Sequence, residues 1–368
     1  MMKHNILTAI DLFAGAGGLS LAALKSGVAV RAAVENDPHA VETYTQNILP
    51  RSASVIEVFA GDIRQMNWRA LLKQAQLVPG ECDILLGGPP CQGFSTHRIK
   101  GAGVGDPRNK LLLSYFESLR IIRPRSFLVE NVTGLLWPRH AAHLKAFLKG
   151  CRESGYLVFD PIILNARDYG VPQNRKRMFI LGLRKDIDAA ICWPPEPTHF
   201  DPNSDAVRRD DKRAWRTSFE VFSLPLPPGD PNAVHMNHTD ELRRVFQSTP
   251  RNGGSRLQSN RLLPCHAKHD GHKDVYGRID PKKPGPTMTT GCVNPSKGRF
   301  VHPTANHAIT ARHAARFQSF PDDFMFSGGL MAAGKQIGNA VPIQLGEIII
   351  TAIATSLRAT RQSRSMVA

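Results

Sequence analysis

The chain has 368 residues, 42% of them hydrophobic, which suffices to bury one large or two moderate cores and excludes a small stapled scaffold or a disordered tail protein. Its 47 Lys and Arg residues outnumber its 31 Asp and Glu residues, giving a formal net charge of +16. This charge attracts polyanions, so nucleic acid is the first partner to consider, although many basic proteins never bind it.

Short apolar runs alternate with helical patterns through the first half of the chain. The runs typical of buried strands are residues 6–13, 28–34, 82–86, 126–129 and 178–183. Strands separated by helices predict an α/β fold whose sheet is parallel and has crossover connections.

The sequence changes character after Arg184. Two segments rich in Pro and Asp follow, WPPEPTHFDPNSD and LPLPPGDPN, and this change indicates a domain boundary. Residues 237–300 carry many Arg, Lys and His residues with Gly and Asn turns, which predicts an irregular, basic second domain. An apolar helix is expected over residues 343–357, packing back on the first domain.

The first strand leads into a glycine turn and then a helix. The turn is Ala14-Gly15-Ala16-Gly17-Gly18, an order that lets a ligand approach the backbone closely. Glu35 ends the second strand, where it can accept from both ribose hydroxyls, and Asp62 follows the VIEVFA run, where it can accept from an adenine amino group. Because the turn lacks the G-x-G-x-x-G spacing, the pattern favours a nucleoside ligand without phosphates, such as S-adenosylmethionine.

The strand at residues 82–86 leads into Pro89-Pro90-Cys91-Gln92-Gly93. The two prolines fix the backbone that enters the turn, and the neighbouring glycines keep the approach open, so the Cys91 thiol is presented at the carboxyl edge of the sheet. Most lone cysteines are inert packing residues, but an inert one needs no such rigid entry. Cys91 is therefore the candidate nucleophile.

Charged residues accompany the next two strands. Glu130 follows the strand at 126–129, where it can bind a ring nitrogen as a protonated or proton-sharing carboxyl; a helix-capping glutamate is the alternative. Arg175 and Arg177 lead into the strand at 178–183, and their alternation points both toward one site, where they can hold a carbonyl oxygen or a carboxylate. A solvated basic turn is the alternative for this pair.

These segments together resemble the DNA (cytosine-5) methyltransferases of bacterial and phage type. The matching runs, from about residue 8 to about residue 345, are DLFAGAGGLS, the Glu35 region, GDI, GGPPCQGFS, ENV, QNRKR and QIGNAVP. The resemblance implies a Rossmann-like S-adenosylmethionine methyltransferase sheet with a smaller, irregular target-recognition domain. The implied domains are 1–184 for catalysis and cofactor binding, 185–304 for target recognition, 305–335 as a hinge and 336–368 as a C-terminal helix.

The resemblance also implies catalytic roles. Cys91 attacks C6 of a cytosine flipped out of the duplex, and Glu130 hydrogen-bonds N3 and the amino group. Arg177 holds O2, and Arg175 supports Glu130 or the Cys91 segment. A thiolate at C6 turns C5 into an enamine carbon that can take the sulfonium methyl group, and the base must flip because its ring is stacked inside the duplex.

In the cofactor site, the resemblance has Phe13 stack on the adenine, Glu35 hold the ribose and Asp62 hold the amino group. The expected cofactor-binding residues are Phe13, Ala14, Gly15, Gly17, Gly18, Leu19, Glu35, Asn36, Asp62, Ile63, Pro89, Asn339, Ala340 and Val341. Asn36 stands where relatives often carry a bulky aromatic, so either the cofactor affinity would be weaker or Phe13 would carry more of it. His313, in TARHAARFQ, replaces a usual glutamate, which affects the expected packing of the hinge.

Basic residues dominate the region from residue 240 to 299, which we expect to contact DNA phosphates and base edges. The candidate DNA-binding residues are Gln92, Ser95, Arg98, Arg251, Arg256 and Arg261. Four residues of metal-ligand type crowd into one short loop: Cys265, His266, His269 and His272. Since no second pair accompanies them, no metal site is predicted.

The compartment follows from cysteine usage and from the absence of targeting patterns. The six cysteines form no C-x-x-C pair and have no regular spacing, which favours a reducing compartment. The N-terminus shows no secretory pattern, and the stretch at 343–357 contains Glu347 and is short for a bilayer. The sequence predicts a cytoplasmic, nucleoid-associated monomer that acts on double-stranded DNA and binds no membrane. A cognate restriction endonuclease and the recognition sequence stay open.

Two other functions fit part of the pattern. A tRNA cytosine-5 methyltransferase shares the catalytic core, but its relatives carry a Cys-Phe-Thr signature that this sequence lacks. A catalytically silent DNA-binding regulator is the second, and the intact Cys91, Glu130 and glycine turn argue against it. DNA methylation is therefore preferred.

Overall fold

The computed structural model describes residues 6–90, 110–261 and 274–367 of the chain. The chain splits by packing into two units. The first comprises Met1–Leu164, Lys176–Glu196 and Gly346–Ala368, and the second comprises Asn165–Arg175 and Pro197–Leu345. The boundaries expected at residues 184, 304 and 335 divide the chain by function, so this division by packing does not test them.

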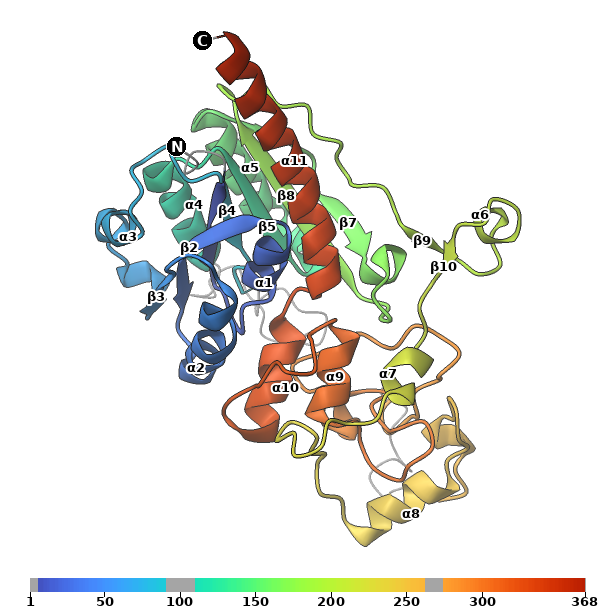
Figure 1. Cartoon of the computed structure of the whole chain (residues 1–368). Helices are drawn as coiled ribbons and strands as arrows, with labels where there is room; N and C mark the ends of the chain where they lie inside the picture. Colours follow the sequence, from blue (N-terminus) through green and yellow to red (C-terminus); the bar gives the residue numbers. More distant parts are fainter. Residues whose placement is uncertain (1–5, 91–109, 262–273, 368) are drawn as a thin grey trace. The chain divides into compact units, whose positions relative to one another are not determined.

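A mixed sheet lies within the first unit (Figure 1). Its strands are β1 (Leu7–Leu12), β2 (Val28–Glu35), β3 (Glu57–Ala60), β4 (Ile84–Gly87), β5 (Ser126–Asn131), β6 (Tyr156–Val158), β7 (Ile162–Asn165) and β8 (Lys176–Arg184). Their order is β3-β2-β1-β4-β5-β8-β6, with β7 paired to β8. Each apolar run that was expected to be a strand forms one of these strands.

The expected parallel sheet is only partly right. Strands β1 to β5 pair in parallel, but β8 runs antiparallel to both β5 and β6. A parallel neighbour needs a long crossover, usually through an α-helix, and within the described residues no α-helix lies between β6 and β8. Antiparallel strands at one side of an otherwise parallel sheet are common in α/β folds.

Helices cover both faces of this sheet (Figure 1). On one face lie α3 (Trp68–Gln74), α4 (Lys110–Ile122) and α5 (Ala141–Glu153); on the other lie α1 (Gly18–Lys25) and α11 (Ile343–Val367). Phe127 of β5 is fully buried between Tyr115 of α4 and Phe147 of α5, at ring distances of 6.4 Å from each. Because both faces are covered, the strands are apolar throughout, and this continuity is what made them visible in the sequence.

Polar bonds hold α11 against the first unit. Arg358 donates to the carbonyl oxygen of Ser26 at 3.0 Å, and Arg361 donates to the buried carboxylate of Asp83 at 2.7 Å. The stretch Gly329–Gln362 is long and apolar enough to cross a membrane by length and composition alone, but 61% of its apolar window is buried inside the protein. That burial is the pattern of a core helix.

Loops make up much of the second unit, as expected for an irregular domain. Its regular elements are β9 (His199–Phe200), α6 (Asp205–Arg208), β10 (Arg213–Ala214), α7 (Phe219–Ser223), α8 (Asp240–Ser248), α9 (Ala311–Phe317) and α10 (Gly329–Asn339). Loop carbonyls that are buried still need hydrogen-bond donors. Arg278, only 1% exposed, supplies them to Phe246, Thr249 and His302 at 2.6 to 3.2 Å.

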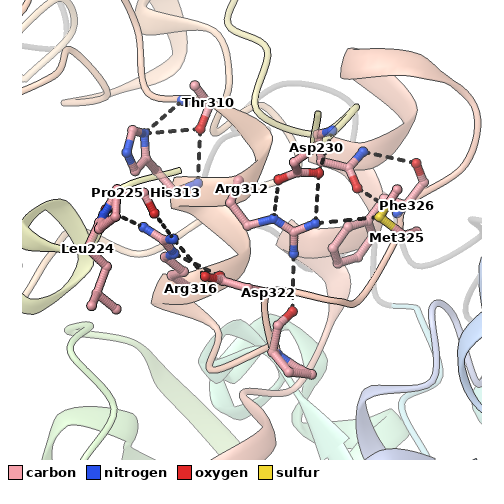
Figure 2. A network of polar contacts seen from close by, with 12 residues as sticks. Leu224, Pro225, Asp230, Thr310, Arg312, His313, Arg316, Asp322, Met325 and Phe326 are labelled. Carbon is pink, nitrogen blue, oxygen red and sulfur yellow. Dashed lines mark hydrogen bonds and ion pairs between the residues drawn. The ribbon is translucent and has the colours of Figure 1, made fainter. Parts of the chain in front are cut away.

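Helix α9 carries a polar network that binds residues 221–232 (Figure 2). Arg312 forms a buried ion pair with Asp230, with 2.6 Å between Nε and Oδ2. Arg316 donates to the carbonyl oxygens of Leu224 and Pro225 at 2.8 and 2.7 Å. These bonds fix the loop before α8 to the helix of the expected hinge.

His313 occupies the position in α9 where the family resemblance leads us to expect a glutamate, and it caps the start of the helix. Thr310 Oγ1 accepts a hydrogen bond from His313 N at 3.1 Å, and His313 Nδ1 accepts one from Thr310 N at 3.3 Å. These reciprocal bonds form the capping box in which Glu or Gln is the common third residue. Burial lowers the pKa of His313 to about 3, so the imidazole caps the helix as a neutral acceptor.

A continuous run of histidine rings crosses this unit; we call it the histidine run. Its members, in order of contact, are His238, His235, His307, His302 and His313. The rings of His235 and His307 stack with centroids 4.0 Å apart. Burial lowers the pKa of His238 and of His302 to about 4. The run is therefore uncharged at neutral pH at these two positions and at His313.

Candidate active site

Several parallel strands end at one edge of the sheet, and predicted site residues follow them there. Because β1, β2, β4 and β5 are parallel neighbours, their carboxyl ends meet at the same edge. Glu35 is the last residue of β2, and Glu130 is the last but one of β5. Ligands of open α/β sheets bind at this kind of edge.

The turn after β1 has an unusual backbone. Phe13, Gly15 and Gly17 have φ angles of 58°, 56° and 93°, and a bulky side chain seldom adopts this region. A Cβ on Gly17 would lie 2.5 Å from Ile48 Cγ1, whereas a Cβ on Gly15 would meet no atom of the described residues within 4 Å. Packing therefore requires Gly17, and Gly15 leaves one side of the turn open to a ligand.

The main chain around Glu35 fixes its carboxylate. Its Oε2 accepts a hydrogen bond from Gly15 N at 2.8 Å, and its Oε1 accepts from Asn36 N at 2.8 Å and from Asp37 N at 2.7 Å. Asp37 is the N-cap of α2 (Pro38–Asn47), so one side chain joins the glycine turn to this helix. A carboxylate has about four lone-pair sites, so the oriented Glu35, which accepts three hydrogen bonds, retains about one site for a ribose hydroxyl.

A second carboxyl group lies buried near the end of β1. Asp11, 0% exposed, accepts a hydrogen bond from Ser20 Oγ at 2.7 Å, and Ser20 Oγ pairs with the Tyr44 hydroxyl at 2.8 Å. The pKa of Asp11 is raised to about 7, mainly by burial, and the charge of Glu35 contributes in the same direction. Asp11 Oδ1 has no hydrogen-bond partner among the described residues. Asp11 was not predicted from the sequence, because an acidic residue inside an apolar strand carries no pattern of its own.

This edge fits S-adenosylmethionine by charge and by shape. The ligand carries a sulfonium and an ammonium group, and the carboxyl groups of Asp11 and Glu35 interact with each other at the end of β1 and β2. An opposite charge nearby stabilises ionised carboxylates. The open side of Gly15 admits a group close to the backbone. The chain thus offers both an acidic edge and an open turn to a cationic nucleoside.

Asp62 lies at the start of a short 3-10 helix, Ile63–Gln65. Its Oδ1 accepts from Arg64 N and from Arg64 Nε, each at 2.9 Å, and a second guanidinium nitrogen bonds Oδ2. These hydrogen bonds lower the pKa of Asp62. Arg64 was not predicted as a partner of Asp62, although it stands two residues further along the chain. Ile63, by contrast, is buried in the core of the first unit.

Glu130 and Arg177 form the central ion pair of the site. The Nε of Arg177 and the Oε1 of Glu130 lie 3.0 Å apart, and the two side chains are 14% and 10% exposed. They come from β5 and β8, which are antiparallel neighbours. Burial lowers the pKa of Arg177 below its usual value, and the carboxylate of Glu130 opposes that effect. The structure thus brings together two of the predicted catalytic residues.

Small and amide residues surround this pair. A Cβ on Gly88 would stand 3.4 Å from Glu130 Oε2, so the backbone after β4 approaches the carboxylate closely. Asn131 Nδ2 donates a hydrogen bond to the Pro89 carbonyl oxygen at 3.2 Å. Neither Gly88 nor Asn131 was singled out from the sequence for this contact.

Arg175 has partners that the sequence did not suggest. Its guanidinium is 0% exposed and donates to the carbonyl oxygens of Met288, Gly338 and Ala340 at 2.7 to 2.9 Å. All of these residues belong to the second unit, whereas the expected partner Glu130 belongs to the first. Arg175 therefore holds the end of α10, where the predicted cofactor residues Asn339, Ala340 and Val341 stand, and a catalytic role for it stays a prediction.

The predicted DNA-binding residues and Cys91 differ in whether the structure describes them and in how exposed they are. Cys91, Gln92, Ser95 and Arg98 lie outside the described residues. Arg251 and Arg261 are exposed, as a DNA contact requires. Arg256 is 4% exposed, and this burial disagrees with its expected place on the DNA surface.

The described part of the chain holds no group of three or more His, Cys, Asp or Glu side chains arranged to bind a metal ion. The cluster of Cys265, His266, His269 and His272 falls outside that part. The expectation of no metal site therefore remains a prediction.

A sheet with helices on both faces, a glycine turn after its first strand and an acidic residue ending its second define an α/β fold of the S-adenosylmethionine-dependent methyltransferase class. Within that class the chain belongs to the C-5 cytosine-specific DNA methylases, whose family model matches residues 7–355.

Curated relatives span nearly the whole chain. The type II methyltransferase M1.HphI of Haemophilus parahaemolyticus is 33% identical over 350 residues, which cover 94% of this chain and 86% of the relative. The type II methyltransferase M.XorII of Xanthomonas oryzae is 32% identical over 378 residues, covering 95% and 85%.

Solved structures agree with this assignment. A prophage-encoded Escherichia coli protein described as a DNA modification methyltransferase has a TM-score of 0.71 and 25% identity, covering 95% of this chain and 99% of that one. The Dnmt2 methyltransferase of Schizosaccharomyces pombe, at a TM-score of 0.56 and 17% identity, shares the fold. The protein is a DNA (cytosine-5) methyltransferase that uses S-adenosylmethionine, and the predicted family, fold class, enzyme class and cofactor are confirmed.

Proposed function

We propose that the protein methylates C5 of a cytosine flipped out of a short duplex DNA site, through a covalent bond between Cys91 Sγ and C6. The ion pair of Glu130 and Arg177 at the carboxyl edge of the sheet carries this proposal. The strand that holds Glu130 is the parallel neighbour of β4, the strand that leads to Cys91. A carboxyl group beside a guanidinium matches a cytosine edge, which presents a ring nitrogen, an amino group and a carbonyl oxygen.

These side chains supply the nucleophile, the proton and the hydrogen bond that the reaction needs. The Cys91 thiolate adds to C6 while the Glu130 carboxyl gives a proton to N3 and Arg177 donates to O2, so C5 becomes a nucleophilic enamine carbon. The bound cofactor supplies an electrophilic methyl group on its sulfonium. After a new bond forms at C5, solvent takes the C5 proton, the bond between Sγ and C6 breaks, and N3 returns its proton to Glu130, which restores the thiolate, the aromatic ring and the Glu130 carboxyl group. Because C6 is stacked inside duplex DNA, the base must leave the helix first.

The cofactor contacts follow the acidic edge. Glu35 would hold the ribose hydroxyls, Phe13 would stack on the adenine, and Asp62 would accept from its amino group. The remaining expected positions from the glycine turn, Pro89 and residues 339–341 would line the ligand. The oriented carboxylate of Glu35 and the open side of Gly15 support this assignment.

The second unit would read DNA, with exposed arginines such as Arg251 and Arg261 reaching phosphates or base edges. The functional boundaries at residues 184, 304 and 335 belong to the same proposal. The proposal also includes a monomeric state and a cytoplasmic location near the nucleoid. It includes a cognate restriction endonuclease as well, which the type II names of the relatives support.

Bisulfite sequencing tests the proposal directly. A host genome that carries the wild-type gene is compared with one that carries Cys91→Ala. Protected cytosines in one short repeated context, absent from the variant, are the expected result. Uniform conversion in both genomes would reject DNA methylation by this route, and tRNA would then be assayed as the substrate before a purely regulatory role.

A further inference from the structure

The side chain of Asn131 connects two neighbouring strand ends in the first unit. Its Nδ2 donates to the carbonyl oxygen of Pro89 at 3.2 Å, and its Oδ1 accepts from Val132 N at 2.7 Å. The second bond fixes which end of the amide faces Pro89. Asn131 is 3% exposed, so both bonds are shielded from water.

This contact stands where the ladder between β4 and β5 has ended. The last paired residues of these strands are Gly87 and Val129. Pro89 and Pro90 have no N–H group and cannot donate to a ladder. The Pro89 residue is nevertheless buried, and its carbonyl oxygen needs a donor. The Asn131 amide supplies that donor in place of a main-chain N–H.

The same strand end holds the catalytic carboxyl group. Glu130 and Asn131 are adjacent in β5, and their antiparallel partners in β8 are Phe179 and Met178. One residue therefore presents its carboxylate to Arg177, and the next binds the chain two residues before Cys91. A change at Asn131 alters the spacing between these two parts without removing a reacting group.

We propose that Asn131 is a positioning residue for methyl transfer, which sets the main chain entering the Cys91 turn relative to Glu130. This inference rests on the proposed function, because positioning has meaning only if Cys91 attacks the base. A change at Asn131 should slow bond formation at C6, because small displacements of reacting groups raise the reaction barrier. The same change should leave the affinity for DNA nearly unaltered.

The test compares Asn131→Asp with Asn47→Asp. The second is a matched control, because the buried Asn47 amide also donates to a main-chain carbonyl oxygen, that of Thr43, at 2.7 Å on α2. Both changes keep side-chain size and replace a donor with an acceptor. The probe is duplex DNA with 5-fluorocytosine at the target position found by bisulfite mapping, which traps the adduct because C5 has no proton to lose.

We expect Asn131→Asp to slow single-turnover adduct formation by about 100-fold, with the dissociation constant for DNA changed less than threefold. Asn47→Asp should lose a similar amount of thermal stability and keep the wild-type adduct rate. Asn131→Ser, which keeps a shorter donor, serves as the second variant if Asn131→Asp does not fold, and should slow the adduct to a smaller degree.

An adduct formed at the wild-type rate by Asn131→Asp, or by Asn131→Ser if that variant is used, would overturn the positioning role alone. Equal slowing in the Asn47→Asp control would also overturn it, because a general loss of stability would then explain both. Absence of any adduct with the wild-type protein would reject the proposed function together with this role.

Discussion

Arg177 lies against the carboxyl group of Glu130, which serves the flipped base in the proposed reaction. The side chains are almost buried, and removing one partner of such a pair leaves the other charge uncompensated. Loss of activity on substitution therefore has to be separated from loss of folding.

Glu130→Gln tests the carboxyl proton with little change of shape. We expect kcat to fall by about 10² to 10⁴-fold, because an amide can bind N3 but cannot give it a proton. The measurement is methyl transfer to mapped duplex DNA under saturating cofactor. Glu153→Gln, an exposed glutamate of α5, is the control and should retain wild-type turnover. A kcat for Glu130→Gln within threefold of wild type would contradict the assigned role.

Gly17 tests the turn that follows β1. Gly17→Ala forces an alanine into φ 93° and brings its Cβ within 2.5 Å of Ile48, so we expect a loss of about 2 to 4 kcal/mol in unfolding free energy and weaker cofactor binding. Gly155→Ala provides the matched control, because φ is 92° there and no described atom lies within 4 Å of its Cβ. That variant should lose only about 1 kcal/mol and bind the cofactor normally. Equal losses would show that packing at Gly17 is unimportant.

At the scale of elements, the histidine run makes the second unit sensitive to acid. Ring nitrogens of His238 and His302 accept main-chain N–H bonds from Ala308 and Ala305, each at 3.0 Å, and protonation there would break those bonds. Burial is the largest cause of the lowered pKa values in the run, and neighbouring histidines and arginines, among them Arg243, Arg278 and Arg316, act in the same direction. Among the described residues, Asp322 is the one charge that opposes them, and it acts on His313.

We therefore expect the melting temperature to fall by several degrees between pH 7.5 and pH 5.0. An unfolded histidine takes up a proton near pH 6.5, whereas the folded His238, His302 and His313 do so near pH 4, 4 and 3. Below pH 6.5 the unfolded chain binds more protons, so the stability contribution fades as the pH falls. Asp11, with a pKa raised to about 7, acts in the opposite direction.

His313→Gln isolates the contribution of the run. Glutamine can retain the capping box with Thr310 but does not titrate. The drop in melting temperature from pH 7.5 to pH 5.0 should be smaller in this variant than in the wild type, while Asp11 contributes equally to both. An identical drop in the two proteins would remove His313 from the explanation.

The whole molecule carries a net charge of +16, and its affinity for DNA should fall steeply with salt. Fluorescence anisotropy with a duplex at several salt concentrations measures the slope of log K against log salt. Arg251 is exposed. If it contacts a phosphate, Arg251→Ala should reduce that slope by about one. Arg256→Ala should leave the slope unchanged and lower thermal stability, because that side chain is 4% exposed. The reverse pattern would return Arg256 to the DNA surface.

Apolar periodicity and motif spacing were enough to predict β1, β2, β4, β5 and β8 and the edge at which Glu35 and Glu130 lie, but not the short strands β6 and β7. They could not predict the direction of β8, because hydrophobicity is the same for parallel and antiparallel strands. Contacts made by side chains with the main chain were also hidden: the carbonyls bound by Arg175 lie more than a hundred residues away, and no local pattern marks them. The burial of Arg256 was not predicted either, because arginine is usually an exposed residue.

The arginine interior of the second unit has an evolutionary consequence. Arg278 and Arg316 bind carbonyl oxygens of the main chain, and every residue type provides such an oxygen. The acceptor side therefore places little demand on which amino acids occupy the loops. Loop sequences can diverge while the arginines keep the framework intact. Under the proposed function, in which this unit reads DNA, new target specificities would arise by exchange of loop residues without redesign of a hydrophobic core.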